Sequence, residues 1–413
     1  MLRVTTLHAS SAAATAAYYA KYLGDAPGEV PGAWSGRQAD AFGLAGDVTV
    51  QQLESLLSGR DPQTGTVLGR ELVDRYTADG RQVRAVSGFD ATFSAPKSLS
   101  VLWALTGDHR LLAAHDTAVA AALAHLERFG STTRIRSNGG RLHPDTVGLT
   151  IASFRQTTSR ADDPQIHTHA VVSAKVQTAD GRWLALDGRY LKRHQRTLGG
   201  LYQSVLRAEL TTAFGVGWLP IVNGQAEVAG IPEELLERFS KRSRDIDAAL
   251  AGKLDEFRLH EGRQPSRWER AAMTREASAD TRSRKSGRGP DDLVTVWQTE
   301  AAEAGWTAPQ LWDTTGDHGV GRVRNSGTGS LQVTDVVEML SAERSTWSRA
   351  DVVRAICDVQ RPIPGIAGQQ WAELVEQAAD RVVAACVDLD PTIDPRVDPT
   401  AGTIDGPSRR ASD

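Results

Sequence analysis

The chain has 413 residues with 40% hydrophobic and 24% charged side chains, a soluble globular composition with room for two or three domains. Its formal net charge of −4 argues against nucleic-acid binding by the chain as a whole. No apolar run reaches membrane-spanning length and no basic-then-apolar leader opens the sequence, so we expect a cytoplasmic protein without membrane insertion.

Hydrophobic patterning predicts a mixture of strands and helices over the first half of the chain. Alternating apolar residues indicate strands, and a period near 3.6 residues indicates helices. The predicted strands are 1–7, 81–93, 132–136, 147–156, 165–177 and 183–186, the last two joined by a turn at 179–181. The predicted helices are 12–23, 50–57, 94–105, 111–129 and helical segments within 188–214.

The second half of the chain is predicted to be helical. Helices are expected at 232–250 and 268–284, and helical patches within 291–313 and 332–387, clearest at 349–359 and 370–387. We therefore divide the chain into a domain at 1–290, a helical linker or start of a truncated C-terminal region at 291–387, and a disordered tail at 388–413. The two cysteines, Cys357 and Cys386, are too few for a disulfide framework and are expected to be packing residues.

Two histidines stand one residue apart on the strand predicted at 165–177. Alternate side chains of a strand point to the same face, so His167 and His169 project together. Two imidazoles at this spacing suit one metal ion, although buried histidines more often make ordinary hydrogen bonds. The window 128–207 around them carries 13 basic and 5 acidic side chains, either a solvated basic face or a surface that attracts phosphate.

Four segments place reactive side chains in an informative order. They are a first helix with Tyr18 and Tyr19, then FDATFSAPKS at 89–98, FRQTTSR at 154–160 and DPQIHTH at 163–169. In this order they resemble the N-terminal relaxase domain of the MobF (TrwC/TraI-like) conjugative relaxases, members of the HUH endonucleases, over about residues 1–300. The resemblance implies an α+β fold, in which helices flank a central antiparallel sheet, followed here by a mostly helical C-terminal region.

The same resemblance implies metal-dependent, site- and strand-specific nicking of single-stranded origin-of-transfer DNA. A tyrosine becomes linked to the 5′ phosphate, and a 3′ hydroxyl later reverses the step. The implied partners are single-stranded and hairpin DNA at the origin, together with a coupling protein and accessory DNA-binding proteins of conjugation. The matching residues are Tyr18 as first nucleophile with Tyr19 beside it, Asp90 as the acidic residue, and His167 and His169 as metal ligands.

The residue types suit this chemistry. A dication withdraws charge from a phosphodiester, and neutral imidazoles leave that charge undiminished. The phenol of tyrosine has a pKa of about 10, so it attacks only when its proton is removed. Asp90 could accept that proton or orient a ligand imidazole, and we favour the orienting role. Lys97 and Arg160 are phosphate-contact candidates by their positions.

Two positions depart from the family pattern. The third metal ligand of the family is a histidine, and Gln156 stands in its place. An amide oxygen binds Mg²⁺ or Mn²⁺ better than zinc or copper, so the site could use Gln156 with a hard metal, bind metal weakly through two histidines, or be inactive, in that order of preference. The stretch 24–36 also lacks the second tyrosine pair of many relatives, which leaves either a mechanism with one nucleophilic centre or a second cut by Tyr19 or Tyr22, with Tyr22 favoured as a packing residue.

Three other functions remain open. A rolling-circle replication initiator would share the chemistry, and a catalytically silent origin-DNA-binding protein would follow if Gln156 disables the site. A metallohydrolase or structural metal protein would bind metal without needing Tyr18. Helicase activity is not expected, because the sequence has no phosphate-binding GxxxxGK[ST] loop, and the chain is either a natural short form or a fragment of a longer relaxase-helicase.

Overall fold

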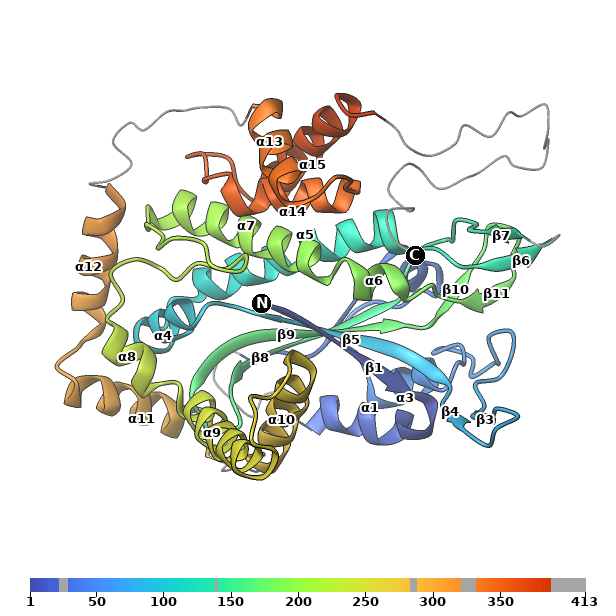
Figure 1. The fold of residues 1–413 in the computed structure, drawn as a ribbon, viewed down its shortest axis with the longest axis horizontal. Coiled ribbons are helices and arrows are strands. Elements are labelled where there is room, and N and C mark those ends of the chain that lie inside the picture. The colour runs from blue at the N-terminus through green and yellow to red at the C-terminus, as the bar shows by residue number, and fades with distance from the viewer. Residues whose placement is uncertain (22–28, 138–139, 283–287, 321–331, 388–413) are drawn as a thin grey trace.

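A five-stranded antiparallel sheet forms the centre of the computed structural model (Figure 1). The structure describes residues 1–21, 29–137, 140–282, 288–320 and 332–387, so Tyr22 and the predicted tail at 388–413 lie outside the described residues. Across the sheet the strands run β1 (Leu2–His8), β5 (Val86–Ser94), β9 (Pro164–Ser173), β8 (Ile151–Thr158) and β2 (Ala33–Ser35). The α+β fold class predicted from the sequence is confirmed.

Helices cover both faces of this sheet, as Figure 1 shows. On one face lie α1 (Ala12–Lys21) and α3 (Val50–Leu57), and on the other α4 (Lys97–Thr106), α5 (His109–Gly130) and α7 (Gln195–Phe214). The α1 face has a small core in which Ala16 and Tyr19 pack with Phe154 and Val171. The main hydrophobic core lies on the α5 face. Successive side chains of each central strand therefore point alternately into the small core and the main core.

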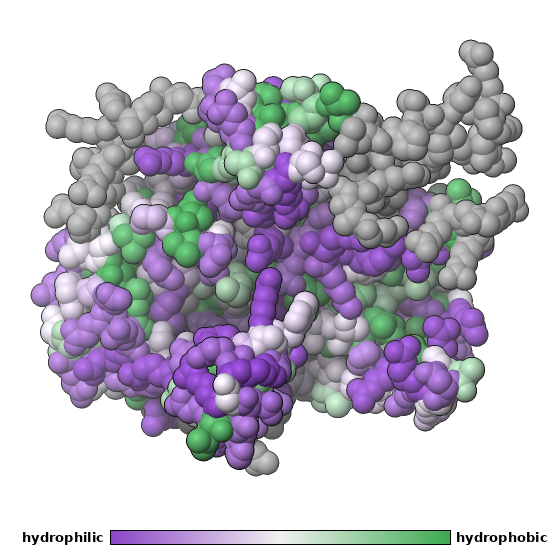
Figure 2. Space-filling model, in the orientation of Figure 1, coloured by the Kyte–Doolittle hydropathy of each residue, from purple (hydrophilic) through white to green (hydrophobic). Residues whose placement is uncertain are grey.

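Short ribbons and further helices surround these layers. The ribbons are β3 (Arg75–Tyr76) with β4 (Gln82–Val83), β6 (Ile135–Ser137) with β7 (Gly140–Leu142), and β10 (Lys175–Gln177) with β11 (Trp183–Ala185). The helices are η1 (Ala9–Ser11), α2 (Arg37–Ala41), α6 (Arg189–Arg193), α8 (Glu233–Arg238), α9 (Lys241–Glu261), α10 (Arg267–Asp280), α11 (Pro290–Glu303) and α12 (Ala308–Val320). Over α9 and α10 the surface in Figure 2 is mostly hydrophilic, as the charged sequences of these helices require.

The strand predicted at 165–177 is β9 followed by β10. Two further predicted elements are also interrupted. The strand predicted at 81–93 is β4 followed by β5, because the main-chain N–H of Ala85 donates to the Asp74 carboxylate (2.7 Å) instead of continuing a ladder. The helix predicted at 232–250 is α8 followed by α9, because Phe239 turns into the core and the main-chain N–H of Lys241 donates to Asp163 (2.8 Å). Both of these interruptions depend on contacts with residues distant in sequence, which the local hydrophobic periodicity cannot predict.

The C-terminal helices pack on the main domain. They are α13 (Val333–Glu343), α14 (Arg349–Val359) and α15 (Gly368–Ala384), and they lie over α5 and α7 (Figure 1). The Trp371 indole donates to Ser204 Oγ (2.9 Å), and the Arg207 guanidinium donates to the Cys357 carbonyl (2.7 Å). Cys357 is buried, as predicted for a packing residue.

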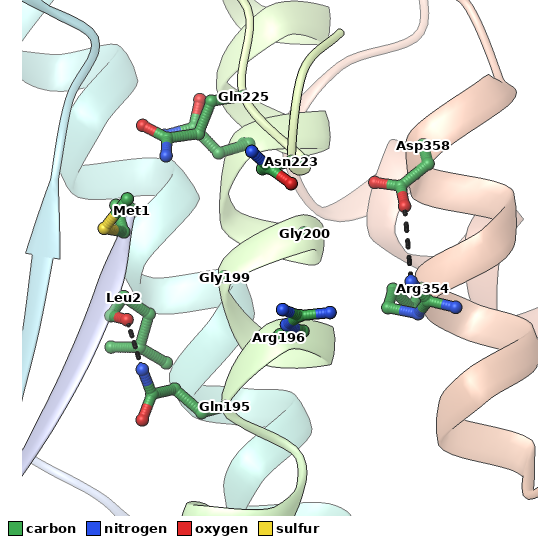
Figure 3. Close-up of a pocket in the computed structure, with 12 residues that line it drawn as sticks. Met1, Leu2, Gln195, Arg196, Gly199, Gly200, Asn223, Gln225, Arg354 and Asp358 are labelled. Atoms are coloured by element: carbon green, nitrogen blue, oxygen red, sulfur yellow. Dashed lines mark hydrogen bonds and ion pairs between the residues drawn. The ribbon is translucent and has the colours of Figure 1, made fainter. Parts of the chain in front are cut away.

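A polar cavity of about 390 Å³ lies at the junction of β1, α7 and α14 (Figure 3). On one side the Gln195 amide donates to the Leu2 carbonyl (2.7 Å), and on the other Arg354 pairs with Asp358 (4.0 Å). Neither of the tyrosines of α1 lines this cavity, so it is separate from the site described below. Among the described helices, none is both long enough and apolar enough to cross a bilayer.

Candidate active site

Tyr19 anchors α1 to the sheet. Its ring stacks on Phe154 (centroids 4.9 Å apart, planes 12° apart) and lies 5.3 Å from the His169 ring. Its hydroxyl is buried and donates to Asp90 Oδ2 (2.9 Å). Burial and the neighbouring carboxylate raise the pKa of Tyr19 well above its ordinary value. The Tyr19 hydroxyl is therefore engaged by Asp90, and a role of Tyr19 as a nucleophile stays a prediction from the sequence.

Tyr18 occupies the next position on the helix and faces a different direction. Consecutive helical residues are rotated by about 100°, so when Tyr19 points inward Tyr18 lies at the rim. Its ring meets Tyr19 edge-on at 5.3 Å between centroids. The guanidinium of Arg160 donates to the Tyr18 hydroxyl (3.2 Å) and lies 5.8 Å from the ring centroid. One of the two predicted phosphate contacts therefore lies beside the predicted nucleophile.

The two histidines of β9 share one face of the sheet. Their ring centroids are 5.2 Å apart. His169 Nδ1 lies 3.0 Å from both carboxylate oxygens of Asp90 and 3.2 Å from Thr92 Oγ1, and His167 Nδ1 lies 2.9 Å from the Gln165 carbonyl. Because these acceptors call for a proton on Nδ1, the lone pair of each ring is on Nε2, the arrangement of a metal-ligating imidazole.

Asp90 is a positioning group in this geometry. Burial alone would raise its pKa, but hydrogen bonds from His169, Tyr19 and Thr92 outweigh burial and keep the pKa of Asp90 below its ordinary value. With three donors already bound, the carboxylate is suited to orient His169 rather than to accept a proton from an attacking phenol. Thr92 was not among the predicted residues, although its place two residues from Asp90 on one strand face could have indicated it.

Gln156 stands opposite His167 on the neighbouring strand. The β8–β9 register pairs Gln156 with His167 and Phe154 with His169, and cross-strand partners share a face. Gln156 is 4% exposed. Within the described ranges no three His, Cys, Asp or Glu residues gather as a metal site, and an amide oxygen lies outside that set. Two imidazoles and one amide oxygen fit a divalent cation that accepts oxygen ligands.

The turn before β9 places Arg160. Asp162 has a positive φ of 57°, and the turn is closed by the Ser159 N–H bonding to the Asp163 carbonyl (2.9 Å). From α11, the Trp297 indole donates to the Asp162 carbonyl (2.7 Å). Arg160 is therefore carried by a turn that is fixed both locally and from a distant helix.

The Lys97 side chain is held in the interior by main-chain carbonyls. Its ammonium donates to the carbonyls of Pro164 (2.9 Å) and Phe239 (2.8 Å). Burial lowers the pKa of Lys97 to about 8, although the charges of Asp163 and Glu227 oppose that shift. A cation held by two internal carbonyls at the start of β9 favours a role in fixing that strand over the phosphate contact expected from the sequence.

Lys97→Met should destabilise the fold without weakening DNA binding. The two carbonyls would lose their donor and Asp163 would keep only Lys241 as a nearby cation, which we expect to lower the free energy of unfolding by about 2–3 kcal/mol. Urea denaturation measures this loss, with Lys192→Met on the exposed side of α6 as the control. Weaker DNA binding by the fully folded variant at unchanged stability would instead indicate a phosphate contact.

Comparison with known proteins identifies the family. Residues 4–304 match the family model described as TrwC relaxase, and the chain belongs to this family. The multifunctional conjugation protein TraI of Escherichia coli (strain K12) is 30% identical over 349 residues, which are 81% of this chain and 18% of TraI. The chain thus spans less than a fifth of the length of this curated relative.

Solved relaxase structures share the fold. The copper-bound conjugative relaxase TrwC in complex with OriT DNA has a TM-score of 0.62 at 29% identity. A metal-bound complex of TrwC with OriT DNA has a TM-score of 0.61 at 30% identity. Each comparison covers 75% of this chain and 100% of the TrwC chain. The resemblance to conjugative relaxases inferred from the sequence is confirmed.

Proposed function

We propose that this chain is a conjugative relaxase domain that nicks and rejoins one strand of origin-of-transfer DNA through Tyr18. The observation that carries the proposal is the position of the Tyr18 hydroxyl. It contacts the Arg160 guanidinium (3.2 Å), and the Tyr18 ring packs on the Tyr19 ring, which in turn lies 5.3 Å from the His169 ring. A nucleophile, a cation and a pair of imidazoles thus border one region of the molecule.

The proposed reaction is a transesterification. The Tyr18 hydroxyl gives up its proton to water and its oxygen attacks the phosphorus, forming a P–O bond, while the bond from phosphorus to the 3′ oxygen breaks and that oxygen takes up a proton from water. The downstream strand is then attached to Tyr18 through its 5′ phosphate. Rejoining is the reverse step, in which a free 3′ hydroxyl attacks the phosphotyrosine and the phenol leaves. Arg160 donates hydrogen bonds to the phosphate oxygens as negative charge builds on them.

A divalent cation, when bound, supplies charge withdrawal from the non-bridging phosphate oxygens. His167 and His169 would hold it through Nε2, and Gln156 through its amide oxygen, which favours Mg²⁺ or Mn²⁺. Asp90 keeps His169 oriented for this task. Tyr19 holds α1 and Asp90 in place and does not attack, because its protonated hydroxyl already donates to that carboxylate.

The proposed partners follow from the family. TrwC is known in complex with OriT DNA, which supports single-stranded and hairpin DNA at an origin of transfer as the substrate here. A coupling protein and accessory DNA-binding proteins of conjugation, and a cytoplasmic location, complete the proposal. Only the relaxase activity is carried over from TraI, because the shared region is 18% of that protein.

Adduct formation tests the proposal. The purified chain is incubated with Mg²⁺ or Mn²⁺ and a library of single-stranded oligonucleotides labelled at the 3′ end, and the products are separated in SDS. We expect a labelled band at the mass of protein plus DNA, because the 3′-labelled fragment keeps the phosphate that Tyr18 attacks. Sequencing the bound strands gives the nick site. A label that leaves the protein in SDS under every metal tested would contradict the proposal and favour a silent DNA-binding protein.

Substitutions of Gln156 test its place as third ligand. Gln156→Ala should weaken Mn²⁺ binding roughly tenfold, because one ligand is lost. Gln156→His should shift preference toward Zn²⁺ and Cu²⁺, since three imidazoles suit those ions better than oxygen donors do. Calorimetric titration of each variant with each metal measures both effects. Unchanged Mn²⁺ affinity in Gln156→Ala would remove Gln156 from the coordination sphere.

A further inference from the structure

A buried polar group lies directly behind the proposed metal site. Thr168 stands between His167 and His169 on β9, so its side chain points to the opposite face of the sheet. There His115 of α5 contacts Thr168 Oγ1 through Nε2 (2.8 Å) and the Tyr202 hydroxyl of α7 through Nδ1 (2.7 Å). His115 and Tyr202 are both fully buried.

The neighbouring strand is held in the same way. The β8–β9 register pairs Thr168 with Arg155, which stands between Phe154 and Gln156. Arg155 forms an ion pair with Asp116, the residue after His115 on α5. His115 and Asp116, consecutive residues of α5, therefore contact Thr168 and Arg155. These two strand residues stand next to the proposed metal ligands His167, His169 and Gln156 but point to the opposite face of the sheet.

These polar groups are set in an otherwise apolar layer. Phe93, the partner of Thr168 on β5, packs against the Tyr202 ring (centroids 5.5 Å apart), and the surrounding residues belong to the main hydrophobic core. Burying a histidine, a tyrosine and a threonine there costs solvation that apolar residues of similar volume would not cost. These hydrogen bonds restrict the geometry more than apolar packing does, because a hydrogen bond requires a defined distance and angle between the groups on the strand and the helix.

We propose that His115 and Asp116 of α5 act as a clamp that positions β8 and β9, and through them the three proposed metal ligands. The proposal rests on the proposed function, because it takes His167, His169 and Gln156 to bind a cation. Complete burial keeps the pKa of His115 well below its ordinary value, so the ring is neutral and donates at one nitrogen while it accepts at the other. Both ring nitrogens of His115 therefore have a hydrogen-bond partner, Tyr202 and Thr168. Thr168 is held on the face of the sheet opposite the proposed metal site.

Mn²⁺ binding to the full chain without DNA tests the clamp. Thr168→Val keeps the shape of the side chain and removes its hydroxyl. Asp116→Ala removes the half-exposed carboxylate of α5 that pairs with Arg155. Each should weaken Mn²⁺ binding roughly tenfold in a protein whose circular dichroism shows it folded. Thr168→Ser retains the hydroxyl and should bind Mn²⁺ as the unaltered chain does.

Thr197→Val is the matched control. Thr197 and Thr168 are each 4% exposed, and Thr197 makes a comparable bond to the Ala350 carbonyl (2.9 Å) away from the metal strands. Equal Mn²⁺ affinity in Thr168→Val, Asp116→Ala and Thr197→Val would overturn the clamp and leave the proposed function standing. If Thr168→Val does not fold, the Mn²⁺ affinity of Asp116→Ala alone tests the clamp. Retained Mn²⁺ binding in His167→Ala would instead remove the proposed metal site itself.

Discussion

Tyr18→Phe is expected to abolish the SDS-resistant adduct completely while leaving DNA affinity within about twofold of the unaltered chain. The ring that packs against Tyr19 remains, so the helix keeps its place, and only the oxygen beside Arg160 is lost. Adduct yield on denaturing gels and binding by fluorescence anisotropy measure the two quantities. Mass spectrometry of the unaltered adduct should find the nucleotide on the peptide that contains Tyr18.

Tyr19→Phe is the matched control for this prediction. It removes a hydroxyl of the same type from the adjacent residue, and its loss costs Asp90 one of three donors. We expect an adduct that forms more slowly, by roughly tenfold or less, at the same tyrosine. The assignment of the nucleophile would be wrong if Tyr18→Phe still became linked to DNA or if Tyr19→Phe alone lost the adduct.

His169→Ala should have the second large effect. It removes one of two imidazoles and leaves the Asp90 carboxylate without the ring that it orients, so we expect Mn²⁺ affinity and adduct yield to fall by roughly a hundredfold. Calorimetry gives the metal affinity, and thermal melting shows how much of the loss comes from unfolding.

His260→Ala provides the comparison, because His260 is an exposed residue near the end of α9. It should bind metal and nick DNA as the unaltered chain does. A metal affinity for His169→Ala equal to that of His260→Ala would mean that the two imidazoles of β9 do not bind the cation. The proposal would then retain Tyr18 and Arg160 but not its metal site.

Local patterns in the sequence predicted four of the five strands of the sheet and part of the site, but not the short edge strand β2. The alternation of β9 places His167 and His169 on one face, and the helix expected at 349–359 has the bounds of α14, which a capping box at Ser348 begins. These features depend on neighbours within a few residues, and the physics that produces them is visible in a short window.

Other features depend on contacts between distant segments. Nothing near Lys97 in the sequence shows that its ammonium will meet the carbonyl of Phe239, 142 residues away. Tyr18 and Tyr19 are chemically identical, and only the packing of α1 on Phe154 separates the partly buried phenol of Tyr18 from the buried one of Tyr19. His115 likewise gains its role from Thr168, 53 residues further along the chain.

The bond from the Trp297 indole to the Asp162 carbonyl has a consequence for the extent of the catalytic unit. Trp297 lies beyond residue 290, where composition placed the domain boundary, yet it is buried against Trp103 and secures the turn that carries Arg160. A shortened form ending ahead of α11 would retain every reactive side chain but would free the guanidinium from its fixed approach to the phenol. We therefore propose that the smallest competent relaxase within this chain includes α11.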